Sequence, residues 1–358
     1  MAGRLRAAPS LSGVTGEAGL IRSISRAAIR ALMLAALAAL LASAPARAEM
    51  EKTIVALPAT AIVFLSAYVA EDAHLYEKEG LEVKTAFITG VGAFNAVVSG
   101  SADFSNSSGL SFNRAAAHGQ RMLAIANTID KLPMEVVLRK DIADAIHFDA
   151  KAPLATRAQA LKGRTMAIDS VNSIVHAYLR VIGRVGGYDP ELITVAPLQP
   201  PDMLSALERK SIEGFSNGPP WPQKVETEDK AVFVAGGIQG DPPGINPLAF
   251  NVIVARPQYC KEHRSICTKM GHAMVAAANF IQDHPDEALG FVKARFKEVG
   301  EAAVTKAFAQ VREATPRLPS VTAAQLEHAD KLNLDAGLMK PEDKVQSYDG
   351  LFTDEFLK

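Results

Sequence analysis

The chain has 358 residues, a formal net charge of −1 and 48% hydrophobic residues. That length is enough for two globular domains with sizeable buried cores. Because the charge is near neutral and no basic run stands out, we expect no nucleic-acid partner. Two cysteines are too few for a disulfide scaffold or a four-ligand zinc site, and we expect no metal site.

Residues 1–48 have the pattern of a secretory signal peptide. Three arginines (Arg22, Arg26 and Arg30) precede the apolar run 31–41, which leads through small residues to Ala46-Arg47-Ala48. The apolar run is shorter than the roughly 20 residues that a membrane-spanning helix needs, so an uncleaved anchor is the less favoured alternative. We therefore expect a periplasmic protein whose signal peptide is cleaved before Glu49.

In chain order, β-rich runs alternate with apolar-periodic helical segments. Strands are predicted at 53–57, 81–87, 101–106, 122–126 and 134–138, with helices at 64–75, 93–98 and 110–117 between the first four. The order continues with strands at 164–169, 193–196, 212–216 and 232–235, and with helices through Tyr178 and over 203–207. This alternation predicts mostly parallel sheets with helices on their faces.

One short stretch occurs twice in this pattern. Phe104-Ser105-Asn106 returns as Phe215-Ser216-Asn217, an offset of 215 − 104 = 111 residues. The same offset pairs 53–56 with 164–167. Self-similarity at so long an offset indicates two related α/β lobes rather than a solenoid.

The rest of the chain breaks the alternation. The polar stretch 141–159 is predicted to be a surface connection, and 236–247 is rich in Gly and Pro. A strand over 249–255 is followed by helices to about 311 and by a tail of two or three short helices. Because an all-helical end cannot form a third α/β lobe, we predict that the chain returns to the first lobe near Pro247. Lobe I would comprise 49–132 and 248–320, lobe II 133–247, and the helices of 321–358 would pack on lobe I.

Ligands of doubly wound sheets bind at the carboxyl ends of strands, which selects five loops here. These loops (58–64, 90–94, 106–109, 169–173 and 217–221) are mostly rich in Gly, Ser, Thr or Asn, which offer hydroxyl, amide and backbone N–H groups. The alternative is that these residues only cap helices. The candidate ligand-binding residues are Ala59, Thr60, Phe64, Gly92, Asn106, Ser107, Ser108, Asp169, Ser170, Asn172, Ser173, Asn217 and Trp221.

The charged and aromatic residues around these loops do not decide whether the ligand is an anion or an apolar compound. None of the five loops contains Arg or Lys, and Lys131 and Lys224 are predicted to be the nearest cations. Asp169 would oppose an anion unless it is satisfied within the protein. The aromatic residues Phe64, Phe94, Tyr178 and Trp221 would either sandwich an apolar group or pack in the core. His176 would either reach the cleft from one helix face or pack within the helix.

No enzyme signature is present in the chain. It contains no G-x-S-x-G elbow, G-x-G-x-x-G loop, P-loop or H-E-x-x-H motif, so we expect no catalytic residue and no cofactor. Cys260 and Cys267 would be too far apart for a disulfide in one continuous helix. However, Arg256-Pro257-Gln258 places Cys260 in a loop before the helix, so a disulfide is feasible, with two reduced thiols as the alternative.

Four motifs recur in the same order in a known family. They are Glu77-Lys78-Glu79-Gly80-Leu81-Glu82-Val83, the stretch 96–104, Leu161-Lys162-Gly163-Arg164 and the stretch 202–207. The chain resembles the periplasmic substrate-binding proteins of ABC transporters in the nitrate/sulfonate/taurine and thiamine-pyrimidine group. This resemblance implies the type II periplasmic binding fold, an α/β fold of two lobes joined by a two-strand hinge. It also implies a membrane permease as partner and, as we expect, a monomer.

The resemblance also implies where the pocket lies and what it does. The family's usual positions fall on Ala59, Thr60, Asn106, Ser107, Ser170, Asn172, Asn217 and Trp221. A small organic solute, either a sulfonate-like anion or a heterocyclic or aromatic compound, would be trapped as the lobes close. The chain departs from the family at Lys210-Ser211-Ile212-Glu213, where G-x-I-D is common, and the basic residues of some sulfonate pockets have no obvious counterpart. The alternatives are a pyrimidine-synthesis type of enzyme on this fold and a sensory binding protein.

Overall fold

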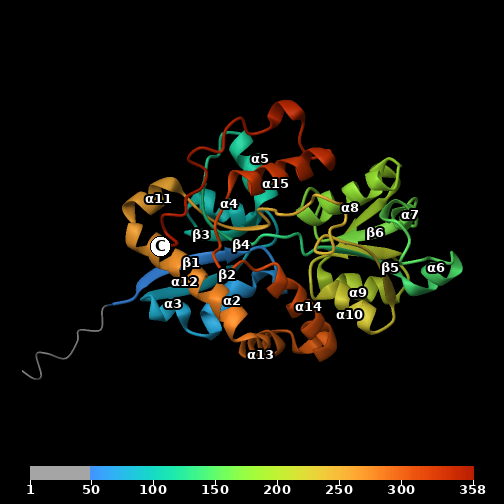
Figure 1. Ribbon diagram of the computed structural model, residues 1–358, viewed down its shortest axis with the longest axis horizontal. Coiled ribbons are helices and arrows are strands. Elements are labelled where there is room, and N and C mark those ends of the chain that lie inside the picture. The colour runs from blue at the N-terminus through green and yellow to red at the C-terminus, as the bar shows by residue number, and fades with distance from the viewer. Residues whose placement is uncertain (1–48) are drawn as a thin grey trace, which may run out of the picture. The chain divides into compact units, whose positions relative to one another are not determined.

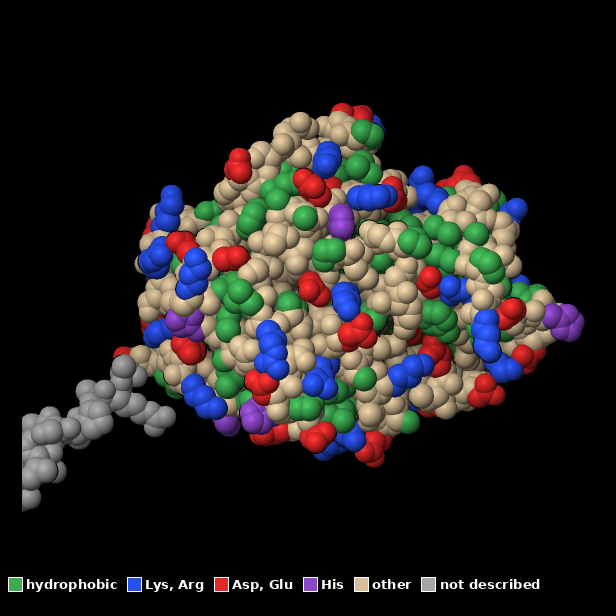
Figure 2. All heavy atoms as spheres, in the orientation of Figure 1, with side chains coloured by type: hydrophobic (Ala, Val, Ile, Leu, Met, Phe, Trp, Pro, Cys, Tyr) green, Lys and Arg blue, Asp and Glu red, His purple; other side chains and the backbone are tan. Residues whose placement is uncertain are grey.

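The computed structural model describes residues 49–358 and contains two five-stranded sheets (Figure 1). The predicted signal peptide, 1–48, lies outside the described residues. Within 49–358, no helix has both the length and the apolar character needed to cross a bilayer. The face shown in Figure 2 carries Lys and Arg side chains interspersed with Asp and Glu, without a large patch of one sign.

The first sheet has the strand order β2-β1-β3-β10-β4. β1 (Glu51–Leu57) pairs in parallel with β2 (Leu81–Phe87) and with β3 (Phe104–Ser108). β10 (Asn251–Ala255) runs antiparallel between β3 and β4 (Leu123–Ile129). A strand from the far end of the chain is therefore inserted into the sheet that the N-terminal segment begins.

The second sheet repeats this pattern with the order β7-β6-β8-β5-β9. β6 (Thr165–Ile168) pairs in parallel with β7 (Thr194–Pro197) and with β8 (Gly214–Asn217). β5 (Glu135–Arg139) runs antiparallel between β8 and β9 (Ala231–Gly236). The two copies of the repeated triplet thus lie on β3 and β8, the central strands of the two sheets.

The repeat is shifted by one residue in the neighbouring strands. Phe104 is paired with Val55 and Phe215 with Ala167, so the strands that flank the triplets are related by 167 − 55 = 112 residues rather than 111. The predicted alignment of 53–56 with 164–167 is therefore wrong by one position. Because side chains alternate between sheet faces, this single step decides which side chains correspond between the lobes.

Helices cover both sheets and form most of the C-terminal part (Figure 1). Those up to the second crossing are η1 (Ile62–Phe64), α2 (Leu65–Asp72), α3 (Leu75–Lys78), α4 (Gly92–Ser99), α5 (Gly109–Ala117), α6 (Lys140–Ala145), α7 (Leu154–Gln159), α8 (Ile174–Val185), η2 (Pro190–Leu192), α9 (Pro200–Glu208) and α10 (Trp221–Thr227). The later ones are α11 (Pro257–Glu262), α12 (Arg264–Asp283), α13 (Pro285–Arg295), η3 (Lys297–Val299), α14 (Glu301–Glu313), α15 (Ala323–Asp335) and η4 (Pro341–Asp343).

Two local predictions differ from the structure. The segment 141–159 contains most of α6 and all of α7, rather than only an irregular surface connection. In addition, β3 runs directly into α5 without a loop. The reason is that Ser108 ends the strand and its Oγ accepts a hydrogen bond from the Ser111 N–H at 3.2 Å, so one residue both closes the strand and caps the helix.

The chain crosses between the sheets twice, over 130–134 and over 237–250. After the second crossing, α15 packs against both α5 and α8, and α14 packs against both α13 and α10. The late helices therefore contact elements that flank both sheets.

The two cysteines are bonded to each other. Cys260 lies in α11 and Cys267 in α12, with their Cα atoms 5.6 Å apart. The helices are separated at His263, whose φ of −121° interrupts the helical path. This break brings the two residues close enough to bridge, which a continuous helix would not allow.

A buried carboxyl group lies where β5 begins, directly after the first crossing. Glu135 is 3% exposed, and its Oε1 accepts a hydrogen bond from Gln310 Nε2 of α14 at 2.7 Å. Gln310 in turn accepts one from Gln223 Nε2 of α10 at 2.7 Å, and Lys306 of α14 is ion-paired with Glu226 of α10. Burial, followed by the nearby Glu226 charge, raises the pKa of Glu135 from its ordinary 4.5 to about 7.

We predict that Glu135→Gln changes how stability depends on pH. Between about pH 4.5 and 7 the folded protein holds a proton on Glu135 that the unfolded chain releases. Raising the pH through this window therefore destabilises the wild type, by about 3 kcal/mol, and the glutamine variant lacks this loss. Urea unfolding at pH 4.5, 6 and 8 measures the difference. A constant difference between variant and wild type across these pH values would contradict the prediction.

Candidate functional site

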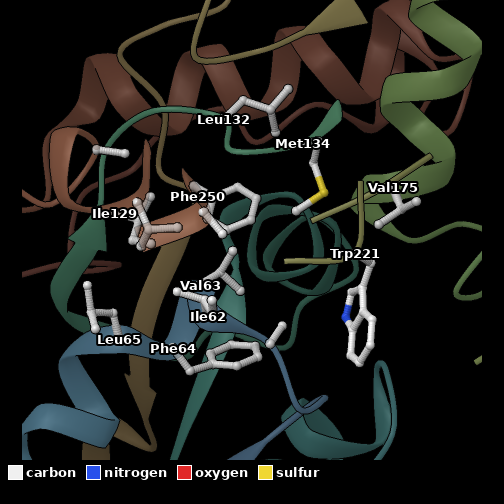
Figure 3. Packing of buried hydrophobic residues seen from close by; sticks show 14 of the residues in the cluster. Ile62, Val63, Phe64, Leu65, Ile129, Leu132, Met134, Val175, Trp221 and Phe250 are labelled. Atoms are coloured by element: carbon white, nitrogen blue, oxygen red, sulfur yellow. The ribbon is translucent and has the colours of Figure 1, made fainter. Parts of the chain in front are cut away.

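Loops from the two lobes meet at the carboxyl ends of the central strands. The Ile62 N–H donates to the Pro219 carbonyl at 3.2 Å, which joins η1 of the first lobe to the loop after β8. Figure 3 shows Ile62, Val63 and Phe64 in one hydrophobic cluster with Met134 and Trp221. A Cβ at Gly218 would lie 2.9 Å from Met134 Cε, so glycine permits this close approach. The lobes are closed on each other along this seam.

Beside the seam lies a cavity of about 80 Å³ that both lobes line. A Cβ at Gly90 of the first lobe would be 3.6 Å from Ser170 Oγ of the second, so the two walls nearly touch. The cavity is bounded by the ends of β1, β3 and β6 and by the first turns of α4, α5 and α8. Its lining residues are Pro58, Gly90, Val91, Phe94, Ser107, Ser108, Ser111, Asp169, Ser170, Ser173 and Ile174.

Five of these residues are serines, and two of them also cap helices. Ser108 is the N-cap of α5 and Ser173 is the N-cap of α8, where its Oγ accepts from the His176 N–H at 3.2 Å. Ser107 shares a hydrogen bond of 2.7 Å with Ser105. Helix capping and lining of the cavity are therefore not exclusive alternatives for Ser108 and Ser173.

Asp169 is satisfied by its own loop. Its Oδ1 accepts hydrogen bonds of 2.6 Å from the Ser170 N–H and from Ser173 Oγ. Burial raises the pKa of this carboxyl, and the two hydrogen bonds lower it in part. Asp169 therefore stabilises the loop 169–173, and one of its two carboxyl oxygens is occupied by hydrogen bonds within that loop.

Arg114 on α5 is a cation that contacts the lining residue Ser111, and the sequence reasoning missed it. Its guanidinium group donates to the Asn172 carbonyl and to Asn333 Oδ1, each at 2.8 Å, and to Ser111 Oγ at 3.4 Å. Among the described residues, no carboxylate lies within ion-pair distance of it, and burial lowers the pKa of this group. Arg114 sits three residues after Ser111 on one helix face, a spacing that offered a signal in the sequence.

Neither of the two lysines predicted to be the nearest cations lines the cavity. Lys131 is ion-paired with Glu313 at 2.8 Å, and Lys224 is ion-paired with Glu228 at 2.7 Å. Both pairs involve helices outside the cavity lining.

The two repeated asparagines differ in their surroundings. Asn106 is fully buried, and neither Oδ1 nor Nδ2 has a hydrogen-bond partner among the described residues. Asn217 is 6% exposed, but its Oδ1 accepts from the Gly218 N–H at 2.7 Å and its Nδ2 contacts Met203 Sδ at 3.2 Å. The first amide has unused hydrogen-bonding capacity, whereas the second is engaged within its own lobe.

The remaining candidates lie around the cavity rather than on its wall. Phe64 and Trp221 are buried in the seam, and Ala59 and Thr60 lie between β1 and η1. Gly92 starts α4, and Asn172 is exposed with φ 60°. Tyr178 is fully buried and donates to the Asp241 carbonyl at 2.9 Å. The cavity therefore brings together five predicted residues: Ser107, Ser108, Asp169, Ser170 and Ser173. Among 49–358, no group of three or more His, Cys, Asp or Glu is arranged to hold a metal ion.

Residues 61–288, well over half of the chain, match the family model described as NMT1/THI5 like. The chain belongs to this family. A comparison with curated protein sequences gave no significant match.

Three solved structures illustrate the fold that this family member shares. A protein from Bordetella bronchiseptica RB50 has a TM-score of 0.70 at 20% identity, covering 86% of this chain and 96% of that one. The alkanesulfonate-binding protein SsuA from Xanthomonas axonopodis pv. citri, bound to MOPS, has a TM-score of 0.64 at 16% identity, covering 82% and 96%. A DszB variant in complex with biphenyl-2-sulfinic acid has a TM-score of 0.59 at 12% identity, covering 86% and 97%.

At these identities the likeness shows the fold alone. With its two mixed α/β sheets and two crossings, the chain has the type II periplasmic binding fold that the sequence predicted.

We predict that Asn106→Leu leaves the protein as stable as the wild type, or raises the free energy of unfolding by roughly 1 kcal/mol. A buried amide without partners costs desolvation free energy that an apolar side chain of similar size avoids. The matched control is Asn113→Leu, because the Asn113 amide donates to the Leu326 carbonyl at 2.7 Å and to Asp330 at 2.9 Å. The control should lose about 1–3 kcal/mol in urea unfolding. An equal loss of unfolding free energy in both variants would contradict the conclusion that the Asn106 amide makes no stabilising hydrogen bond.

Proposed function

We propose that this protein is the periplasmic solute-binding component of an ABC importer and that it captures a small organic anion between its lobes. The observation that carries the proposal is the cavity at the closed seam, lined by serine hydroxyls from both lobes with the Arg114 guanidinium beside it. A ligand held there contacts both lobes at once. Binding energy then favours the closed arrangement over an open one.

The Arg114 guanidinium favours an anion over a neutral heterocycle, and the Asp169 carboxyl on the cavity wall is engaged by Ser170 and Ser173 of its own loop. Arg114 is partly buried, and its described partners are uncharged oxygens, so its positive charge remains uncompensated. A sulfonate or carboxylate would compensate this charge and accept hydrogen bonds from Ser107 and Ser111. Phe94 and Ile174 supply apolar wall for a short substituent. Membership of the family and the likeness to an alkanesulfonate-binding protein support the same ligand class.

In this proposal the closed form docks on a membrane permease, and the protein acts as a periplasmic monomer. The lobes are divided as the sequence suggested: 49–132 with 248–320 form lobe I, 133–247 form lobe II, and 321–358 follow. The composition of the two sheets supports this division. Because α15 packs on both α5 and α8, we propose that it contacts both lobes rather than lobe I alone. The periplasmic proteins among the similar structures support the location.

An enzyme on this fold is the second candidate, since the similar structures include DszB as well as binding proteins. The chemistry of this chain argues against a thiol mechanism. Its two cysteines are bonded to each other between α11 and α12, and neither lines the cavity. Whether the closed form signals to a receptor instead of a permease depends on the partner.

We predict that short alkanesulfonates such as ethanesulfonate raise the melting temperature and that Arg114→Gln abolishes this shift. Loss of one charge-assisted hydrogen bond should weaken binding at least about tenfold. Arg209→Gln, which makes the same change at an exposed position, is the control and should bind like the wild type.

Calorimetric titration with ethanesulfonate, taurine, benzoate and a neutral pyrimidine tests the ligand class. If the Arg114→Gln variant bound every anion with wild-type affinity, Arg114 would not be part of the binding site. If no compound of the panel bound, capture of such solutes would be refuted.

A further inference from the structure

A second and larger cavity lies on the other side of the loop 169–173. Its volume is about 390 Å³, against about 80 Å³ for the cavity at the seam, and it falls within the roughly 300–1,000 Å³ range of small-molecule pockets. One wall comes from α8 and β7 of the second lobe. The opposite wall is Gly337 and Leu338, just after α15, the helix that packs on α5 of the first lobe.

The polar wall of this cavity offers hydrogen-bond donors. His176 Nδ1 accepts the Asn172 N–H at 3.0 Å, so in the neutral ring Nε2 carries the hydrogen. Burial, followed by the Arg180 charge, lowers the pKa of His176, which keeps the ring neutral at pH 7. Arg180 lies one helical turn further along α8. Its Nε donates to the Ala336 carbonyl and its Nη1 donates to the Glu191 carboxylate. Its Nη2 makes no hydrogen bond to the described residues.

Two guanidinium groups meet at the end of this wall. A Cβ at Gly337, whose φ is +69°, would lie 2.7 Å from Arg184 Nη2 and 3.5 Å from Arg180 Nη2. Among the described residues, only Arg180 of these two has a carboxylate partner, and that partner, Glu191, has a side chain 71% exposed to solvent. Arg184 is exposed to solvent and does not line the cavity, whereas Glu191 lines it together with Arg180. The donors left free for a bound anion are therefore Arg180 Nη2 and His176 Nε2.

The opposite side of the cavity is apolar. Leu179 and Ile193 are buried, and Val195 and Leu338 are partly buried against the hydrophobic core. Donors at one end and aliphatic side chains along the rest are complementary to a molecule with a charged head and a short chain.

We propose that this second cavity binds a short-chain aliphatic monoanion, with the anionic group between His176 and Arg180 and the chain on Leu179, Ile193 and Val195. Because one wall belongs to the second lobe and the other follows the helix packed on the first, the bound anion would tie the lobes together. The site is separate from the solute cavity of the proposed function and does not depend on it.

Calorimetric titration of the purified protein with sodium hexanoate, against sodium chloride at equal concentration, tests the site. Arg180→Gln removes the charge, and Leu338→Trp fills the cavity without changing charge. Each should weaken hexanoate binding at least about tenfold. Arg114→Gln, in the other cavity, should change hexanoate affinity by no more than a few fold, and the exposed Arg209→Gln should bind hexanoate like the wild type. Thermal unfolding of each variant shows whether it is folded, and if Arg180→Gln is not, Leu338→Trp decides.

Two results would overturn the proposal. One is hexanoate binding that Arg114→Gln abolishes and that Arg180→Gln and Leu338→Trp retain, because the anion would then occupy the seam cavity. The other is the absence of any heat of binding in the wild type.

Discussion

The insertion of one antiparallel strand into each sheet is the constraint on which the rest of this structure depends. β10 enters the first sheet beside β3, and β5 enters the second beside β8, each directly after a crossing between the lobes. Two covalent connections restrict the lobes to hinge motion, and they keep the carboxyl ends of β3 and β8 facing one seam. The cavity lies there because parallel strands and helix N-termini of both lobes converge at those ends.

The seam combines an apolar contact with a polar joint at its edge. Val63, Met134 and Trp221 exclude water from the closed lobes, and such contact is favourable but not directional. The joint at Glu135 supplies direction, because Gln310 and Gln223 connect α14 and α10 to the start of β5 through two hydrogen bonds of 2.7 Å. A buried carboxyl group is a costly means of fixing geometry. Glu135 directly follows the first crossing, so its hydrogen bonds help to fix the position of one lobe relative to the other.

The sequence predicted those features that rest on local pattern. The repeated triplet located the two central strands, and the Ser- and Asn-rich loops located five residues of the cavity wall. The one-residue shift between Val55 and Ala167 was not visible, because a repeat offset says nothing about the register of strand pairing. Arg114 was missed for a related reason: its contact with Asn172 spans 58 residues and two lobes, and no periodicity reports such a contact. The Cys260–Cys267 bond needed the helix break at His263, for which Pro257 was only a hint.

Asn172 connects the two cavities through its backbone. Its carbonyl accepts from Arg114 beside the seam cavity, and its N–H donates to His176 on the wall of the second. The left-handed φ of 60° points these two groups in different directions, a conformation that asparagine tolerates better than most residues. An anion that draws the Arg114 guanidinium into the seam cavity competes with the Asn172 carbonyl for the same N–H group. The loop 169–173, and with it the imidazole orientation, would then loosen. The resulting coupling is limited to about one hydrogen bond, which corresponds to a change in affinity of a few fold and has the same size in both directions.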